Sequence, residues 1–169
     1  MISRYFVLFI LPLSLFAFLP AQTPSVNSLR GVWKVVQIKL ALSGKEYVNA
    51  EPQPGMMIFT SEYYSMVWMP QDKKQPDNTT IWQPTDIEKI QQFNSIIVNS
   101  GSYTLSDSLL TTFPLVAKTP EFIGGKADYH WSVRQDTLQL IVREIYSRDG
   151  VLDEGAQKYP TTLLLVRVE

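Results

Sequence analysis

Eight short β-rich segments, each bounded by turn-forming residues, are the feature that most constrains the fold of this chain. Most of them follow one another closely enough to be joined as antiparallel hairpins. Strands that pair in chain order in this way are typical of an up-and-down barrel. The sequence therefore predicts an all-β fold, an up-and-down antiparallel barrel of about eight strands. We expect the strands at 32–41, 56–60, 63–69, 101–105, 109–117, 127–134, 137–146 and 161–168.

The first of these segments contains an irregularity. Strict alternation puts Val36 and Ile38 on one face of the strand, whereas Trp33 falls on the other face together with Val35. Two apolar faces in one strand predict either a β-bulge or a strand end that is buried on both sides.

One segment has a helical rather than a β-strand period. Thr85 and Glu88 have the spacing of a capping box, in which each side chain bonds the backbone of the other residue. Apolar residues then recur at helical spacing: Ile87, Ile90, Phe93 (or Asn94) and Ile97. These patterns predict one helix over about 85–98, with its apolar stripe against an apolar surface.

The composition excludes several classes of function. The chain of 169 residues has no cysteine and a single histidine, His130, so it can form no disulfide, thiolate metal site or multi-histidine metal site. Its 15 Lys and Arg balance 16 Asp and Glu, which provides no basic surface for nucleic acid. An apolar fraction of 45% with 18% charged residues is typical of one globular domain. We expect no metal and no cofactor.

The N-terminus has the layout of a signal peptide. A basic start ending at Arg4 precedes an apolar run over 5–19, and Ala21 is a small residue suited to the cleavage site. A membrane anchor is the alternative, but it needs about 20 apolar residues, and this run is shorter and contains Pro12. We expect cleavage after Ala21, a domain over 28–169, and a secreted or periplasmic protein without a stable membrane anchor.

The order of several motifs resembles one known family. Gly31-Val32-Trp33 opens the first strand, and the segments 54–60, 101–103, 120–124 and 136–140 follow it in the same layout. Over about 28–168 the chain resembles the bacterial lipocalin-like domain family of the lipocalin and calycin superfamily. The resemblance implies a small β-barrel with one helix inserted mid-chain.

The same resemblance implies a structural clasp at the closed end of the barrel. In lipocalins the tryptophan of the Gly-x-Trp motif packs beneath a basic side chain from a late strand. Gly31, Trp33 and Arg167 are the residues expected to form it here, with Arg143 as the second candidate for the basic group.

Aromatic and methionine residues are the candidates for a binding site. An eight-stranded barrel is either filled by side chains or holds one small ligand. Alternation leaves two faces open for one hairpin strand: either Tyr64, Met66 and Trp68 point inward, or Tyr63, Val67 and Met69 do. We favour the first set because an exposed Trp68 is costly. The candidate ligand-binding residues are Tyr64, Met66, Trp68, Tyr103, Phe113, Tyr129 and Trp131.

Three functions remain open at this stage. The first is binding of a small, mainly apolar molecule without catalysis. The second is a barrel enzyme, such as an isomerase, hydratase or hydrolase, with Tyr129, His130 and Glu144 as its best residues. The third is a filled barrel with a structural or interaction role. We assign no catalytic residue, because the chain lacks the Gly-x-Ser-x-Gly motif and no acid has an adjacent partner. The expected partner is a small hydrophobic molecule and not a nucleic acid, while the oligomeric state is left open.

Overall fold

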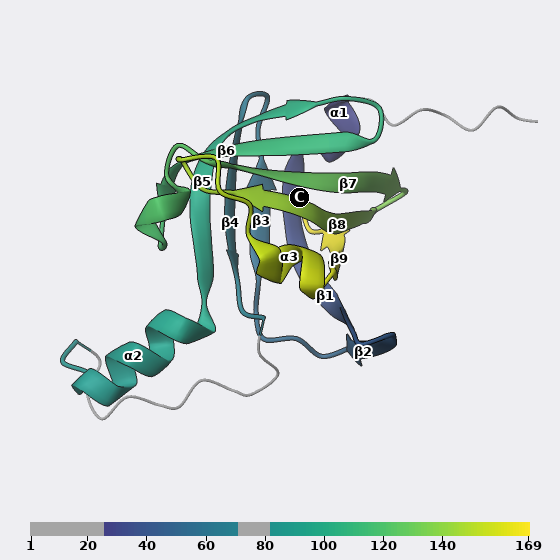
Figure 1. The fold of residues 1–169 in the computed structure, drawn as a ribbon. Helices are drawn as coiled ribbons and strands as arrows, with labels where there is room; N and C mark the ends of the chain where they lie inside the picture. Colours follow the sequence, from purple (N-terminus) through teal and green to yellow (C-terminus); the bar gives the residue numbers. More distant parts are fainter. Residues whose placement is uncertain (1–25, 71–81) are drawn as a thin grey trace, which may run out of the picture.

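The computed structural model describes residues 26–70 and 82–169 (Figure 1). The expected signal peptide at 1–21, with its cleavage site after Ala21, lies outside these residues. The elements are α1 (Val26–Leu29), β1 (Gly31–Leu42), β2 (Lys45–Asn49), β3 (Met56–Phe59), β4 (Tyr63–Trp68), α2 (Asp86–Ser95), β5 (Ile97–Leu105), β6 (Leu109–Ala117), a 3-10 turn η1 (Pro120–Phe122), β7 (Lys126–Arg134), β8 (Thr137–Tyr146), α3 (Glu154–Lys158) and β9 (Thr161–Arg167).

The strands close into an antiparallel barrel. From β3 to β9 each strand pairs with the next, and β1 pairs with β3 on one side and with β9 on the other. Eight strands therefore form a continuous ladder, which leaves no open sheet edge between the first and last barrel strands. All eight expected segments form strands, so the predicted up-and-down barrel is confirmed.

One strand in the described residues was not predicted. β2 pairs with β1 beyond the part of β1 that contacts β3, with Leu40 opposite Tyr47. Ser43 and Gly44 connect the two strands with φ angles of 50° and 77°, the left-handed conformation of a two-residue hairpin turn. Because most of β2 is exposed, its residues show no alternation between apolar and polar.

The predicted bulge in β1 is present. The pairing of β1 with β9 shifts register between Val35 and Gln37. The shift brings Trp33, Val35 and Ile38 all into the buried set, although strict alternation would place Ile38 on the opposite face from the other two. The bulge thus lets one strand supply the core at both ends of the barrel.

The helix begins as predicted but ends earlier. The Thr85 side chain accepts from the Glu88 backbone N–H, and Glu88 accepts from the Thr85 N–H at 2.6 Å. Ile96 is already extended and Ile97 starts β5, so Ile97 is not part of the helical stripe.

The expected burial of that stripe was wrong. Ile87, Ile90 and Phe93 are 70%, 61% and 53% exposed, and Figure 1 shows α2 projecting away from the barrel. The chain runs from the end of α2 at Ser95 almost directly into β5 at Ile97. Because the helix follows the direction of this strand, it extends outward rather than across the sheet. No helix in the described part of the chain is long and apolar enough to cross a membrane.

One end of the barrel is closed by a contact between its first and last strands. The Trp33 ring is fully buried, and its Nε1 donates to the Leu29 carbonyl at 2.8 Å. The Arg167 guanidinium lies 4.1 Å from the centre of that ring. It also donates to the carbonyl oxygens of Ser28, at 2.6 Å, and Arg30. The structure thus places Arg167, rather than Arg143, over Trp33, and the arginine joins β9 to the segment that enters β1.

Gly31 is required by the same contact. Its φ of 133° is a conformation that side-chain-bearing residues rarely adopt. A Cβ atom at this position would overlap the Glu169 carbonyl oxygen and the Arg167 guanidinium. The glycine of the Gly-x-Trp motif therefore makes room for the arginine that covers the tryptophan.

We predict that Gly31→Ala lowers the free energy of unfolding by about 2 kcal/mol or more, because it combines backbone strain with overlap. Gly44→Ala is the matched control, since Gly44 also has a positive φ but no neighbour within 4 Å of the added Cβ. It should cost only the strain, about 1 kcal/mol. Urea unfolding of both variants measures the difference, and equal losses would contradict the role of Gly31.

We predict that Arg167→Met destabilises the barrel by about 2–3 kcal/mol, through loss of the cation–π contact and of the bonds to two carbonyls. Arg143→Met removes the same charge from an exposed position of β8 and should change the unfolding free energy by less than about 0.5 kcal/mol. Urea denaturation distinguishes the two variants. A comparable loss in both would show that net charge, and not the contact with Trp33, matters.

Candidate functional site

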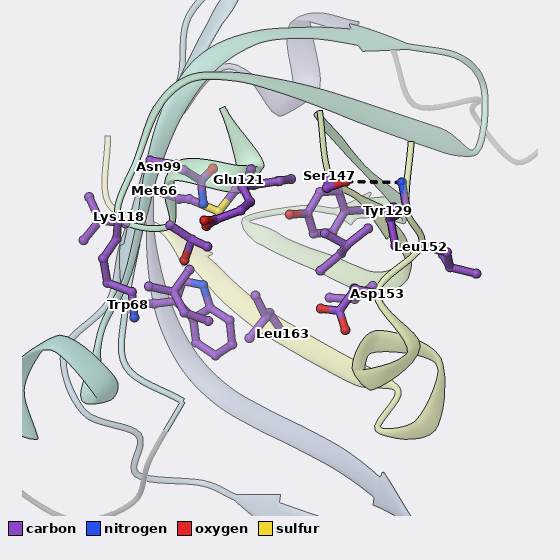
Figure 2. A pocket seen from close by; sticks show the side chains of 18 residues that line it. Met66, Trp68, Asn99, Lys118, Glu121, Tyr129, Ser147, Leu152, Asp153 and Leu163 are labelled. Atoms are coloured by element: carbon purple, nitrogen blue, oxygen red, sulfur yellow. Dashed lines mark hydrogen bonds between the residues drawn. The ribbon is translucent and has the colours of Figure 1, made fainter. Parts of the chain in front are cut away.

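A cavity of about 430 Å³ opens at the end of the barrel opposite Trp33 (Figure 2). This volume lies within the range of about 300–1,000 Å³ that is usual for small-molecule sites. Residues from each of the strands β4 to β9 line the cavity, and the loop before α3 forms part of its rim. The lining residues are Met66, Trp68, Ile97, Val98, Asn99, Ala117, Lys118, Thr119, Glu121, Phe122, Tyr129, Val142, Ile145, Ser147, Val151, Leu152, Asp153 and Leu163.

Three of the residues proposed from sequence line this cavity. They are Met66, Trp68 and Tyr129. Tyr64 is also buried and lies behind Asn99. The Tyr64 hydroxyl donates a hydrogen bond to the side-chain oxygen of Asn99 at 2.7 Å. Alternation along β4 thus directs the favoured set inward.

Tyr63 and Val67, from the alternative set, are exposed on the outside of β4. A role of the inward residues in binding a ligand stays a prediction.

Two other candidates belong to the packed core rather than to the cavity wall. Tyr103 stacks edge-on against Phe59 at 5.6 Å and donates to the Thr60 carbonyl at 2.6 Å. Trp131 is buried and donates to the Ser106 carbonyl at 3.2 Å. Neither residue is among those that line the cavity.

Phe113 does not line this cavity. Its neighbours Thr112 and Pro114 are the buried residues of this part of β6, so alternation turns Phe113 to the outside, where it is 38% exposed. Sequence reasoning chose the aromatic residue, whereas the smaller neighbours occupy the inward positions.

The residues considered for an enzyme do not converge. Tyr129 lines the cavity, whereas His130 follows it on β7 and is exposed, with Nδ1 3.2 Å from the Ser108 carbonyl oxygen. Glu144 accepts from the Tyr146 hydroxyl at 3.0 Å and pairs in register with Asp128. Among the described residues no three His, Cys, Asp or Glu side chains gather in a way that could hold a metal ion.

Two residues of the cavity wall, Asn99 and Tyr129, belong to a cluster of buried polar groups, of which Asn99 and Thr112 were missed from sequence. Asn99, Thr112 and the hydroxyls of Tyr64 and Tyr129 are buried together between β4, β5, β6 and β7. Burial raises the pKa of Tyr129 to about 12 and moves the pKa of Tyr64 upward as well, while hydrogen bonding with Thr112 lowers both in part. Both phenols are therefore neutral hydrogen-bonding groups at physiological pH. The sequence prediction began this strand at residue 101, whereas β5 begins at Ile97, so Asn99 lay outside the predicted strands and was assigned to no face.

The rim of the cavity carries charged side chains. Lys118 Nζ donates to the Phe93 carbonyl at 2.6 Å and lies 4.6 Å from the centre of the Phe93 ring. Burial lowers the pKa of this lysine. Glu121 and Asp153 also lie on the rim, and the Asp153 carboxylate caps α3 by accepting from the Gly155 N–H at 2.8 Å. The described part of the rim therefore has two carboxylates and one ammonium group.

A second hollow of about 640 Å³ lies where β1 and β2 extend past the barrel. Tyr47 and Val48 of β2 form part of its wall and are about half exposed, as is much of the surrounding hairpin. This second hollow has fewer buried apolar side chains than the cavity inside the barrel, and none of the candidate ligand-binding residues lines it.

An eight-stranded up-and-down barrel, closed under a Gly-x-Trp motif and an arginine and hollow at its other end, defines the lipocalin-like class of β-barrels. The family model described as "Lipocalin-like domain" matches residues 30–167, and the chain belongs to this family. No curated protein and no solved structure matches the chain.

Proposed function

We propose that this protein binds a small, mainly apolar molecule in the cavity lined by Met66, Trp68 and Tyr129, and that it does not transform this molecule. The lipocalin-like barrel indicates small-molecule binding in general. The observation that carries the more specific proposal is the cavity of about 430 Å³, whose wall is mostly aliphatic, aromatic and thioether groups. A fully packed barrel would leave no such volume at one end.

Hydrophobic burial is sufficient for moderate affinity at this site. A ligand that buries about 250 Å² of apolar surface gains about 6 kcal/mol. Loss of translational and rotational freedom offsets part of that gain, so shape and polar contacts must supply the remainder. Met66 can adapt its side chain to ligands of different outline, because thioether side chains are flexible and polarisable.

The absence of catalysis in this proposal rests on the arrangement of titratable groups. His130 is the chain's single imidazole, and it faces away from the cavity. The Tyr129 phenol in the cavity wall is neutral at physiological pH, and burial raises its pKa further, while Asp153 is engaged in capping a helix. Among the described residues of the cavity, no side chain that could act as a base lies within hydrogen-bonding distance of a nucleophile.

We predict that Ala117→Trp weakens binding of the neutral apolar dye Nile red at least tenfold, because the indole occupies the cavity beside Asn99. Val116→Trp is the matched control, since Val116 precedes Ala117 on the same strand and is 65% exposed on the outside. Dye fluorescence gives both affinities. Equal loss in the two variants, or failure of the wild-type protein to bind both Nile red and smaller apolar compounds, would refute the proposed site.

Export is the second part of the proposal, and it rests on the sequence of residues 1–21. We predict that the protein is recovered outside the cytoplasm, in the periplasm or the medium, and that its intact mass corresponds to a chain beginning at Gln22. Mass spectrometry of the protein purified from each cell fraction measures this. An uncleaved chain confined to the cytoplasmic fraction would contradict it.

A further inference from the structure

Asn99 is a buried polar side chain in an otherwise apolar part of the cavity wall. It is 4% exposed, and its neighbours across the strand pairing are Met66 and Ala117. The Tyr64 hydroxyl donates to Oδ1 at 2.7 Å and thereby fixes the orientation of the amide. No described residue accepts from Nδ2, and Figure 2 shows this nitrogen on the cavity side.

Trp68 supplies a second donor without a protein partner. This tryptophan is only 7% exposed, and it lines the same cavity. The two other buried tryptophans, Trp33 and Trp131, each donate their indole N–H to a backbone carbonyl. The indole N–H of Trp68 has no such acceptor among the described residues, and Figure 2 shows its nitrogen facing the cavity.

The strand pairing puts these two donors close together. Trp68 lies opposite Ile97 in the register of β4 and β5, and Asn99 is two residues further along β5. Diagonal neighbours of this kind on one sheet face are about 7–8 Å apart at their Cα atoms. Neither N–H is among the described side-chain atoms that are closed off without a partner, so both are accessible from the cavity. A ligand that displaces water from them loses affinity unless it supplies an acceptor in its place.

The charges of the site argue for a neutral acceptor. Glu121 and Asp153 place two carboxylates on the rim, and Lys118 is already engaged with the carbonyl and ring of Phe93. An anion held at Asn99 would lose its hydration and gain only uncharged donors, which costs several kcal/mol. A carbonyl oxygen has two lone pairs and carries no charge, so it can accept from both N–H groups without this penalty.

We propose that Asn99 and Trp68 form a two-donor subsite that binds the carbonyl oxygen of a neutral, otherwise apolar ligand, such as a ketone or an ester. This inference rests on the proposed function, because it specifies the chemistry of the molecule that occupies the same cavity. Tyr64 is the positioning residue of the subsite, since its hydroxyl holds the Asn99 amide with Nδ2 toward the ligand.

Three matched compounds test the inference by isothermal titration calorimetry on the full chain: tetralin, its ketone tetralone, and the carboxylate tetrahydronaphthoate. We expect the ketone to bind about 5–10 times more tightly than the hydrocarbon, which corresponds to one or two net hydrogen bonds. The carboxylate should bind more weakly than the ketone. Asn99→Leu should abolish the preference for the ketone over tetralin.

Two further variants separate the subsite from general effects on folding. Trp68→Phe keeps a ring in the wall but removes the N–H, so it should reduce the preference for the ketone even if Asn99→Leu fails to fold. Asn94→Leu makes the same replacement as Asn99→Leu at an exposed position of α2 and should leave the preference unchanged.

The outcomes distinguish the two proposals. Equal affinities for tetralin and tetralone, or tighter binding of the carboxylate, overturn the subsite while the apolar cavity stands. Binding of Nile red without measurable binding of tetralone has the same consequence. If neither the dye nor any of the three compounds binds, the proposed function fails and the subsite fails with it.

Discussion

The contact between Arg167 and Trp33 is the interaction on which the rest of the structure depends. A barrel has to join its first strand to its last, and this chain has no cysteine with which to fix that join. The guanidinium covers the Trp33 ring while binding carbonyls that precede β1, so β9, β1 and the chain entering β1 are held at one point. Gly31 is part of the same arrangement, because no other residue leaves space for the arginine. The Gly-x-Trp motif is therefore explained by packing.

Closure at this end leaves the opposite end free to be hollow. The bulge between Val35 and Gln37 lets β1 bury Trp33 at the closed end and Ile38 nearer the open end. Large side chains fill the barrel around Trp33, whereas Met66, Trp68 and Leu163 line the cavity at the other end. The clasp and the cavity thus lie at different ends of one ladder, and the residues of the clasp are absent from the cavity wall.

Sequence predicted the parts of this structure that depend on alternation and on local capping. The eight barrel strands each have a buried face, and the capping box of Thr85 and Glu88 is a local bond pattern. β2 was missed because an exposed strand has no buried face to produce alternation. The stripe of α2 was read as buried because amphipathic spacing does not specify what lies opposite it. In the site, Phe113 was preferred to its neighbours on residue type, while burial is determined by the pairing of β6, which turns Thr112 inward.

Asn99 shows why the candidate site could not be derived from hydrophobicity alone. A barrel that served only as a scaffold would gain stability from an apolar residue at this position, since removing a polar side chain from water costs free energy. The Tyr64 hydroxyl donates to the oxygen of the Asn99 amide and leaves the amide nitrogen directed at the cavity. On the neighbouring strand, Trp68 provides a second N–H donor in the same wall. Two donors that are accessible from the cavity would lose their hydration beneath a purely apolar ligand, whereas they keep a hydrogen bond beneath a ligand that carries an acceptor. The polar groups of the cavity therefore restrict the ligand more narrowly than the many apolar ones do.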